Sequence, residues 1–364
     1  MKKIFLFFSA IAMISCSGEN PSRQDDLANL KLANYRPQSI YEIPRSTIEK
    51  AAFTVIDMHS HDYATNMEEI DQWVKTMDHA GIEKTIILSM QSSQGFDEVV
   101  KKYAKYPDRF ELWCGLDFTG YDTDEDWVSN TVSELERCHS LGATGVGELG
   151  DKGEGLIYSK PTPAYGIHLD DPQLKSVWDK CAELNMPVNI HVAEPIWMYE
   201  PMDSTNDGLM NAYTWKVDMT KEGILNHGEL MQTLENAVRD NPNTTFIACH
   251  FANCSYNTSI IGAMLDKYPN LYTDNSARYA ETAPIPRHMK KFYEKHQDRI
   301  LYGTDMGMDK TMYATTFRIL ESEDEHFYEA DQFGYHWALN GFGLPEPILE
   351  KIYNKNAQRF VETP

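Results

Sequence analysis

The chain has 364 residues, of which 42% are hydrophobic, and this length and apolar content are enough for one large folded domain. Its formal net charge is −22 at pH 7, from 33 basic and 55 acidic residues. Such an acidic chain repels phosphate backbones and anionic lipid surfaces, so the composition argues against nucleic acid as a partner and against electrostatic adhesion to a membrane.

Residues 1–15 have the pattern of a secretory signal peptide. Lys2 and Lys3 precede an apolar run that is too short to span a bilayer as a helix. The following Met13-Ile-Ser-Cys16 segment resembles the lipobox of bacterial lipoproteins, although Leu is usual where Met13 stands. The resemblance implies acylation of Cys16 and a cell-envelope protein held to a bacterial membrane, on its periplasmic or surface face, by the lipid alone. The alternative is an ordinary signal peptide followed by an incidental cysteine.

Residues 16–52 are expected to form a lipidated tether and an N-terminal arm that packs across the main domain, residues 53–364. The first part of this segment is small and polar, as suits a flexible tether. The remaining cysteines are scattered and odd in number, which predicts buried free thiols rather than disulfides or a cysteine metal site. They are Cys114, Cys138, Cys181, Cys249 and Cys254.

Eight short β-prone runs follow in order, and they are continuously apolar, as expected of strands covered on both faces. They span residues 53–58, 84–89, 110–116, 144–149, 187–191, 244–249, 270–274 and 300–304. Helical periodicity appears between them, at residues 124–141, 170–184, 228–238 and 284–293. Alternation of strands and helices predicts an α/β fold, and eight repeats predict a (βα)8 TIM barrel with a long insertion after strand 5.

Histidines and carboxylates stand where several of these strands end, and active sites of such barrels lie at those ends. They are His59 and His61 after strand 1, Glu148 in strand 4, His191 in strand 5, His250 after strand 6 and Asp305 after strand 8. Positions i and i+2 of extended backbone project to one side, so the first two imidazoles can reach one ion. Histidines and carboxylates without thiolate favour zinc, with manganese or iron as alternatives.

This order of residues resembles the amidohydrolase superfamily, in particular the amidohydrolase-related branch that includes aminocarboxymuconate-semialdehyde decarboxylase and sugar lactonases. The phrases around 55–61, 301–305 and 352–360 fit that branch, and the resemblance covers roughly residues 53–361. It implies that His59, His61, His191 and Asp305 hold the metal and that Asp305 is also the catalytic base. His250 would bind a second metal or orient water and substrate.

Glu148 departs from the simplest pattern of the superfamily. Binuclear members often carry a carboxylated lysine on strand 4, whereas a glutamate there is similar to TatD-like deoxyribonucleases, in which it bridges two metals. The alternative is a carboxylate that orients a ligand imidazole. One ion is expected, and two if Glu148 bridges.

The insertion at residues 194–226 contains Trp197, Tyr199 and Trp215 and suggests a substrate lid. A packed structural loop, or a contact in a homo-oligomer, is the alternative. Lys152 and Arg278 follow strands 4 and 7, where they would hold an anionic substrate unless they only form surface ion pairs. Six other histidines are expected to be structural residues on helices: His79, His139, His288, His296, His326 and His336.

We therefore expect a metal-dependent hydrolase that attacks a small polar, anionic metabolite, such as a lactone or an amide, with metal-activated water. A non-oxidative decarboxylase of the same superfamily is the alternative, since one barrel can host both reactions. A lipid-anchored solute-binding protein is the third interpretation, and the water-activating carboxylate argues against it.

Overall fold

The computed structural model describes residues 27–153 and 156–361. It divides into two compact units, residues 1–37 and 38–364. The described part of the first unit contains one short 3-10 helix, η1 (Leu32–Asn34). The signal peptide and Cys16 lie outside the described residues, so secretion and acylation stay predictions. Within the described ranges, no helix combines the length and the apolar character needed to cross a membrane.

The second unit is built around eight parallel strands whose order in the sheet follows the chain. They are β1 (Val55–Ser60), β2 (Ile82–Leu88), β3 (Phe110–Cys114), β4 (Ala143–Asp151), β7 (Val188–Val192), β8 (Phe246–Ala248), β9 (Leu271–Asp274) and β10 (Ile300–Leu301). Backbone hydrogen bonds from Met58 to Tyr302 and from Thr304 to His59 join the last strand to the first. The predicted TIM barrel is confirmed.

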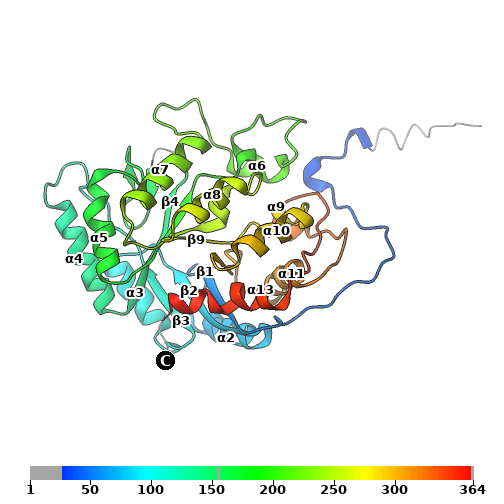
Figure 1. Cartoon of the computed structure of the whole chain (residues 1–364), viewed down its shortest axis with the longest axis horizontal. Coiled ribbons are helices and arrows are strands. Elements are labelled where there is room, and N and C mark those ends of the chain that lie inside the picture. Colours follow the sequence, from blue (N-terminus) through cyan, green and yellow to red (C-terminus); the bar gives the residue numbers. More distant parts are fainter. Residues whose placement is uncertain (1–26, 154–155, 362–364) are drawn as a thin grey trace, which may run out of the picture. The chain divides into compact units, whose positions relative to one another are not determined.

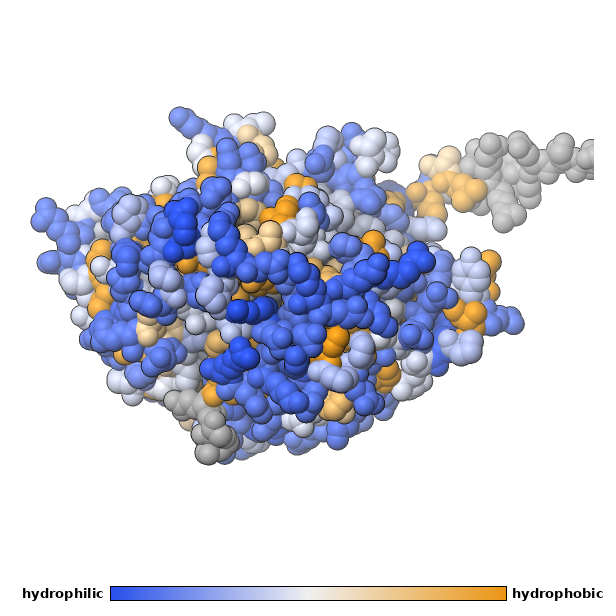
Figure 2. Space-filling view, in the orientation of Figure 1, coloured by the Kyte–Doolittle hydropathy of each residue, from blue (hydrophilic) through white to orange (hydrophobic). Residues whose placement is uncertain are grey.

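Helices lie around the strands and bury their apolar stripes against them (Figure 1). The main ones are α2 (Met67–Ala80), α3 (Ser93–Tyr103), α4 (Trp127–Ser140), α5 (Lys175–Glu183), α7 (His227–Asp240), α8 (Ser259–Lys267), α10 (Pro286–His296) and α11 (Lys310–Glu321). Capping residues fix several of their starts. Asn226, for example, forms a capping box with Glu229 at the start of α7. On the face shown in Figure 2 the surface is mostly hydrophilic, as the net charge leads one to expect.

The interior of the barrel has its own small apolar core, separate from the core beneath the helices. It draws side chains from strands and from the C-terminal segment: Ile56, Met58, Ile86, Leu88, Trp113, Ile247, Tyr272, Leu301 and Ala357, with Phe360 and Val361 packed against them. Gly145 of β4 makes room for the indole, since a Cβ there would lie 2.3 Å from Trp113 Cδ2. This packed interior is a rigid base on which the polar strand ends are held.

One buried carboxylate ties the first and last strands together at the level where the apolar interior gives way to polar residues. Asp57 accepts hydrogen bonds from the Thr304 hydroxyl at 2.6 Å and from the backbone N–H groups of Thr304 and His59. Burial raises the pKa of Asp57 to about 7, although these donors oppose the rise. The join fixes the position of His59 relative to the chain that leads to Asp305.

The segment after α11 contacts the N-terminal arm and contains two of the histidines that were expected to lie on helices. Within the barrel unit, the backbone N–H of Ser46 donates to both carboxylate oxygens of Asp324 at 3.0 Å, which ties the arm to the segment after α11. The expectation that His326 and His336 lie on helices is wrong, because both occupy irregular chain. His326 instead contacts Ser39 and Tyr41 of the arm.

The insertion after β7 contains a short 3-10 helix, η3 (Ile196–Met198), and the helix α6 (Leu209–Trp215). Two further strands begin at the carboxyl end of β4: β5 (Leu156–Tyr158) pairs with Gly150 and Asp151 of β4, and β6 (Ala164–Tyr165) pairs with β5, both antiparallel. These strands are too short to show periodicity, so this small meander could not be predicted from the sequence.

Replacement of Gly145 tests the packing of the barrel interior. Gly145→Ala places a methyl group against the buried ring of Trp113, and we expect a loss of about 1–3 kcal/mol of unfolding free energy. Gly228→Ala, in the first turn of α7, is the matched control, since its nearest neighbour would lie at 3.4 Å. Thermal or urea unfolding measures both. Equal stabilities of the two variants would contradict this account of the core.

Candidate metal centre and active site

Six predicted site residues meet at the carboxyl end of the barrel. His59 lies in β1, Glu148 in β4 and His191 in β7, while His61, His250 and Asp305 follow β1, β8 and β10. The backbone is left-handed at His250 (φ 60°) and at Asp305 (φ 57°). Non-glycine residues rarely adopt this conformation outside sites where the surrounding structure enforces it. At His250, Asp274 enforces it by accepting the backbone N–H at 3.0 Å.

Two carboxylates stand among the imidazoles. Glu148 Oε2 lies 3.3 Å from His61 Nε2, and Glu148 Oε1 lies 3.4 Å from His250 Nε2. Asp305 Oδ1 lies 3.0 Å from His61 Nε2 and 3.7 Å from His59 Nε2, and Asp305 Oδ2 lies 3.6 Å from His250 Nε2. The donor atoms therefore enclose one small polar space.

Hydrogen bonds at Nδ1 aim three of the imidazoles into this space. His59 Nδ1 contacts Asp274 Oδ2 at 3.0 Å, His61 Nδ1 contacts the Leu88 carbonyl at 2.9 Å, and His250 Nδ1 contacts the Ser276 carbonyl at 2.9 Å. Carboxylates and carbonyls only accept hydrogen bonds, so Nδ1 carries the proton and Nε2 presents a lone pair. This arrangement orients histidine ligands in metal proteins.

Lone pairs that face carboxylates repel unless a positive charge lies between them. The Nε2 atoms of His59, His191 and His250 are buried and have no hydrogen-bond partner among the described residues. Buried polar atoms without partners are rare and need an explanation. A divalent cation provides one, since neutral imidazoles and carboxylates are its usual ligands. The cluster is a buried metal site of histidine, glutamate and aspartate donors.

The pKa values show that the site needs positive charge. Burial would lower the pKa of His59 and His61, but Asp274, Asp305 and Glu148 outweigh it and raise both, that of His61 well above its ordinary value, so without a metal these imidazoles attract the protons that a bound cation would replace. Burial lowers the pKa of His250 to about 4, so its imidazole is neutral near pH 7. Burial would raise the pKa of the Asp305 carboxyl, but His59 and His61 outweigh it and hold that pKa below its ordinary value. The pKa of Glu148 is likewise lowered, because His191 and the other imidazoles outweigh its burial. Both carboxylates are therefore anionic.

The donors fall into three groups. One contains His59, His61 and Asp305, another contains Glu148, His191, His250 and Cys249, and a third, of His59, His250 and Asp274, shares one histidine with each. Burial holds the pKa of the Cys249 thiol well above its ordinary value, so this residue is a poor ligand. The groups adjoin through the contacts of Glu148 with His61 and of Asp305 with His250. The donor set suits one ion or two, and the bridging role of Glu148 stays a prediction.

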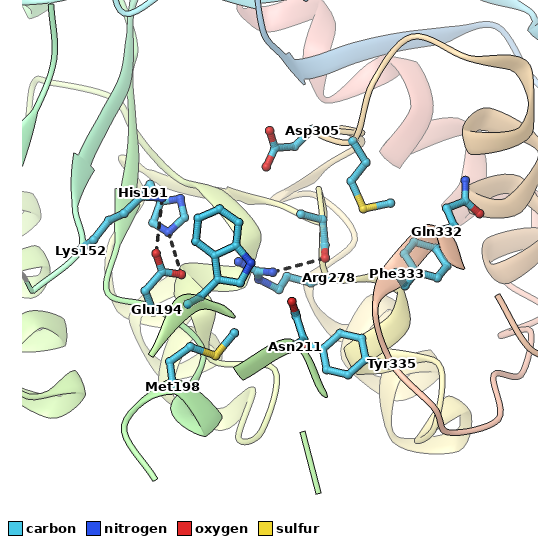
Figure 3. A pocket seen from close by; sticks show the side chains of 13 residues that line it. Lys152, His191, Glu194, Met198, Asn211, Arg278, Asp305, Gln332, Phe333 and Tyr335 are labelled. Carbon is cyan, nitrogen blue, oxygen red and sulfur yellow. Dashed lines mark hydrogen bonds and ion pairs between the residues drawn. The ribbon is translucent and has the colours of Figure 1, made fainter. Parts of the chain in front are cut away.

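His191 has a different orientation from the other three histidines. Its Nδ1 lies 2.8 Å from Glu148 Oε1, and its Nε2 lies 3.6 Å from Glu194 Oε2. It therefore connects the metal donors to the first residue of the insertion. In Figure 3 the Glu194 carboxylate contacts both His191 and Lys152.

A cavity of about 320 Å³ opens beside the donor cluster. Its walls are Lys152, His191, Glu194, Met198, Asn211, Trp215, Ala277, Arg278, Asp305, Met306, Gln332, Phe333 and Tyr335. Asp305 belongs to both the donor cluster and the cavity wall (Figure 3). The volume suits a small metabolite, and the wall combines aromatic rings with two cationic side chains.

Two of the predicted substrate contacts lie elsewhere. Trp197 packs on Trp337, with ring centroids 5.9 Å apart, and donates from its indole N–H to Asp207. The Tyr199 hydroxyl accepts the backbone N–H of Glu194 at 3.2 Å. Neither lines the cavity, because each is occupied in holding the insertion together. Trp215, also predicted, does line it.

Lys152 and Arg278 line the cavity as predicted, and both have carboxylate partners. Lys152 Nζ lies 3.4 Å from Glu194 Oε1 and over the Trp215 ring at 5.8 Å. Arg278 Nη1 lies 3.1 Å from Glu281 Oε1. Glu194 has its pKa lowered to about 2 because His191, Lys152 and Arg278 outweigh its burial.

Several residues of the site were not predicted from the sequence. Asp274 ends its strand as the predicted ligands do, and this position was the available signal. Glu194, the first residue of the insertion, follows His191 by three residues. Asn211 and Tyr335 carry no local signal, since segments far apart in the sequence bring them to the cavity.

Metal analysis tests the donor cluster. Purified protein should contain at least about one equivalent of a divalent transition metal. Loss of one ligand weakens metal binding, so we expect His61→Ala to lose most of the metal on dialysis. His79→Ala removes a surface histidine, whose side chain is 44% exposed, and should retain it. Metal-free wild-type protein, or equal metal content in both variants, would refute the assignment.

Comparison with solved structures gives the same barrel in several proteins. A dihydroxybenzoic acid decarboxylase from Polaromonas sp. JS666, with bound manganese and the inhibitor 2-nitroresorcinol, matches 85% of this chain and 96% of its own at 17% identity (TM-score 0.54). A 2,6-dihydroxybenzoate decarboxylase from Rhizobium matches 85% and 98% at 18% identity (TM-score 0.52). A 4-oxalomesaconate hydratase from Rhodopseudomonas palustris matches 84% and 95% at 15% identity (TM-score 0.51). At such identities the likeness shows the fold alone.

No curated protein matches the sequence. The sequence profile of a family described as Amidohydrolase, in contrast, matches residues 56–362. This span contains every residue of the donor cluster and of the cavity wall. Because the match covers well over half of the sequence, the chain belongs to the amidohydrolase family.

Proposed function

We propose that this metal-dependent enzyme catalyses the non-oxidative decarboxylation of a small hydroxylated carboxylic acid, with an aromatic acid as the first candidate. The observation that carries the proposal is the position of Asp305, between the metal donors and a cavity that also presents Arg278 and aromatic rings. The cavity offers a site for a carboxylate, a surface for a ring and a group that transfers a proton.

Arg278 is the proposed carboxylate-binding group. Its Nε donates to Asn253 and its Nη1 to Glu281 and Ala277, while Nη2 has no acceptor among the described residues. The side chain is only 10% exposed and lines the cavity. A guanidinium nitrogen in so sheltered a position binds a carboxylate oxygen more strongly than one in water does.

The donor set would hold a divalent cation, with manganese and zinc as the leading candidates. When bound, such a cation acts as a Lewis acid that neutralises negative charge on substrate oxygens. The protein's own contribution is the orientation of four imidazoles and two carboxylates before substrate arrives. That preorganisation is supported by the contacts of Asp274, Leu88 and Ser276 with the ligand imidazoles.

Asp305 is the proposed proton carrier. In decarboxylation the bond to the carboxyl carbon breaks, its electron pair stays on the substrate carbon, CO2 leaves and a proton takes its place. Asp305 is ionised in the resting site and lies 3.3 Å from the Tyr63 hydroxyl. It can accept a proton from a substrate hydroxyl and deliver it to the carbon that loses CO2.

The known activities of proteins with this barrel support a decarboxylase over the hydrolase first expected. Two of the three similar structures described above are decarboxylases of dihydroxybenzoic acids, and the third is a hydratase. Trp215, Phe333 and Tyr335 also provide an aromatic wall for a ring. Hydrolysis of a lactone or an amide is the second candidate, because an ionised Asp305 could equally take a proton from water.

A panel of hydroxybenzoates, lactones and N-acyl compounds separates these reactions. We expect CO2 release from at least one hydroxybenzoate and, in D2O, one deuterium at the carbon that carried the carboxyl group. Mass spectrometry and NMR of the product measure this. Turnover of lactones or amides alone would reject the decarboxylase and favour hydrolysis.

Asp305→Asn tests the proton carrier. The amide cannot take up a proton, so we expect kcat to fall by roughly 10²–10⁴-fold while the fold is kept. Tyr63→Phe is the control, because it removes only the hydroxyl that touches Asp305 and should cost less than about tenfold. A variant with nearly unchanged kcat would show that another group moves the proton.

Arg278→Ala tests carboxylate binding. We expect a rise in KM of roughly 10–100-fold for anionic substrates, since a charge-assisted hydrogen bond is lost. The corresponding change at the surface, Arg239→Ala, should leave KM unchanged, because the hydrogen bonds of this arginine in the described part of the chain go to Asp240 and Asn236. Unchanged kinetics in Arg278→Ala would eliminate it as the anion site.

A further inference from the structure

A continuous hydrogen-bond chain leads from the insertion to Arg278. The Asn211 side-chain amide, in α6, donates to the Tyr335 hydroxyl at 2.9 Å. That hydroxyl donates to Glu281 Oε1 at 2.8 Å, and the same oxygen accepts from Arg278 Nη1 at 3.1 Å. Every donor in the chain meets an acceptor, and the hydrogen bonds converge on Glu281 from the amide at one end and from the guanidinium at the other. Asn211, Tyr335 and Arg278 also line the cavity, where they are seen together in Figure 3.

Glu281 is the centre of this chain. It lies in the short helix α9 (Tyr279–Thr282), and its side chain has no solvent exposure. Its second oxygen, Oε2, is buried without a hydrogen-bond partner among the described residues. A carboxylate buried in this way depends on a nearby cation, because removal from water is otherwise costly. Arg278 is the cation that contacts it.

The contacts fix the guanidinium as well as balance its charge. Asn253 Oδ1 accepts from Nε at 2.8 Å, and Glu281 accepts from Nη1, so two of the three nitrogens are already hydrogen-bonded to the protein. The third, Nη2, is left for the cavity. Arginine loses little further freedom when a ligand binds a guanidinium already held at two points.

The same pairing limits the charge that the cavity can accept. Both cationic side chains in its wall have carboxylate partners, Lys152 with Glu194 and Arg278 with Glu281. Among the described residues, the wall therefore carries no excess positive charge. Apart from a bound metal ion, the wall therefore offers a second substrate carboxylate only cations that Glu194 and Glu281 already pair.

We propose that Glu281 and Tyr335 are positioning residues that hold Arg278 for a substrate carboxylate and restrict the site to singly charged acids, with Asn211 coupling the insertion to this role. The inference rests on the proposed function only in taking the bound carboxylate to be the substrate's. The expected substrate is a monocarboxylic acid that carries a ring, and dicarboxylic acids are expected to bind more weakly.

Calorimetric binding of benzoate and phthalate to the metal-loaded protein tests this without turnover. We expect wild type to prefer benzoate. Tyr335→Phe should weaken benzoate binding by roughly 3–10-fold, as for one lost hydrogen bond that orients the carboxylate. The matched control is Tyr353→Phe, which removes an equally buried phenol from another glutamate, Glu321, at 2.9 Å. This control should stay within about twofold of wild type.

Glu281→Gln tests the charge limit directly. The change leaves Arg278 uncompensated, so the ratio of phthalate to benzoate affinity should rise by roughly tenfold at low salt. Asn211→Ala and Tyr335→Phe should weaken benzoate binding less than additively when combined, because both interrupt one chain. If Glu281→Gln does not fold, the tyrosine pair and this double variant still decide the proposal.

Three results would overturn the inference. They are equal benzoate affinities in Tyr335→Phe and Tyr353→Phe, an unchanged phthalate-to-benzoate ratio in folded Glu281→Gln, and no benzoate binding by wild type at millimolar concentration. The reaction can fail separately. If the variants bind benzoate and phthalate as expected but no acid loses CO2, the decarboxylase proposal is wrong and the carboxylate site stands. If an acid is decarboxylated but the variants bind benzoate like the control, the decarboxylase stands and the positioning role of Glu281 and Tyr335 is wrong.

Discussion

His61 Nε2 lies 3.0 Å from Asp305 and 3.3 Å from Glu148, while its Nδ1 is committed to the Leu88 carbonyl. Two anionic groups this close to a buried imidazole nitrogen need a positive charge beside them, which raises the pKa of His61 well above its ordinary value and which a metal ion can supply in place of the proton. A cation among these atoms changes the sign of every one of those interactions. Many of the hydrogen bonds at this end of the barrel hold the metal-donor atoms close together although these atoms repel one another.

Two buried aspartates carry most of that scaffold. Asp274 contacts the His59 ring and accepts the backbone N–H of His250, and Asp57 joins the chain before His59 to Thr304, next to Asp305. The left-handed backbone at His250 and Asp305 is held in place by these contacts. Beneath them the apolar interior around Trp113 gives the strand ends little freedom to relax. Local strain is therefore balanced by rigid packing below it.

The sequence could predict what local pattern and strand position determine. Continuous apolar runs gave the eight barrel strands, and reading their ends gave His59, His61, Glu148, His191, His250 and Asp305. Trp197 and Tyr199 show where this reasoning ends, because an aromatic residue in a loop packs on its own loop as readily as on a ligand. The pairing of Glu281 with Arg278 and Tyr335 depends on how α9 meets a segment more than fifty residues later. A contact between two such distant segments leaves no periodic pattern in the sequence from which it could be predicted.

The pairing of charges in the cavity has a consequence for how metal and substrate interact. Lys152 and Arg278 are each balanced by a carboxylate, and Asp305 adds a negative charge at the wall. Apart from the histidines, these side chains therefore give the cavity no net positive charge with which to attract the carboxylate proposed as its ligand. A cation bound among the histidines reverses the sign of the local potential, so metal occupancy and carboxylate binding must strengthen each other by the same factor. Under the proposed function, Arg278 would determine where the substrate carboxylate lies, and the metal would determine how strongly it binds.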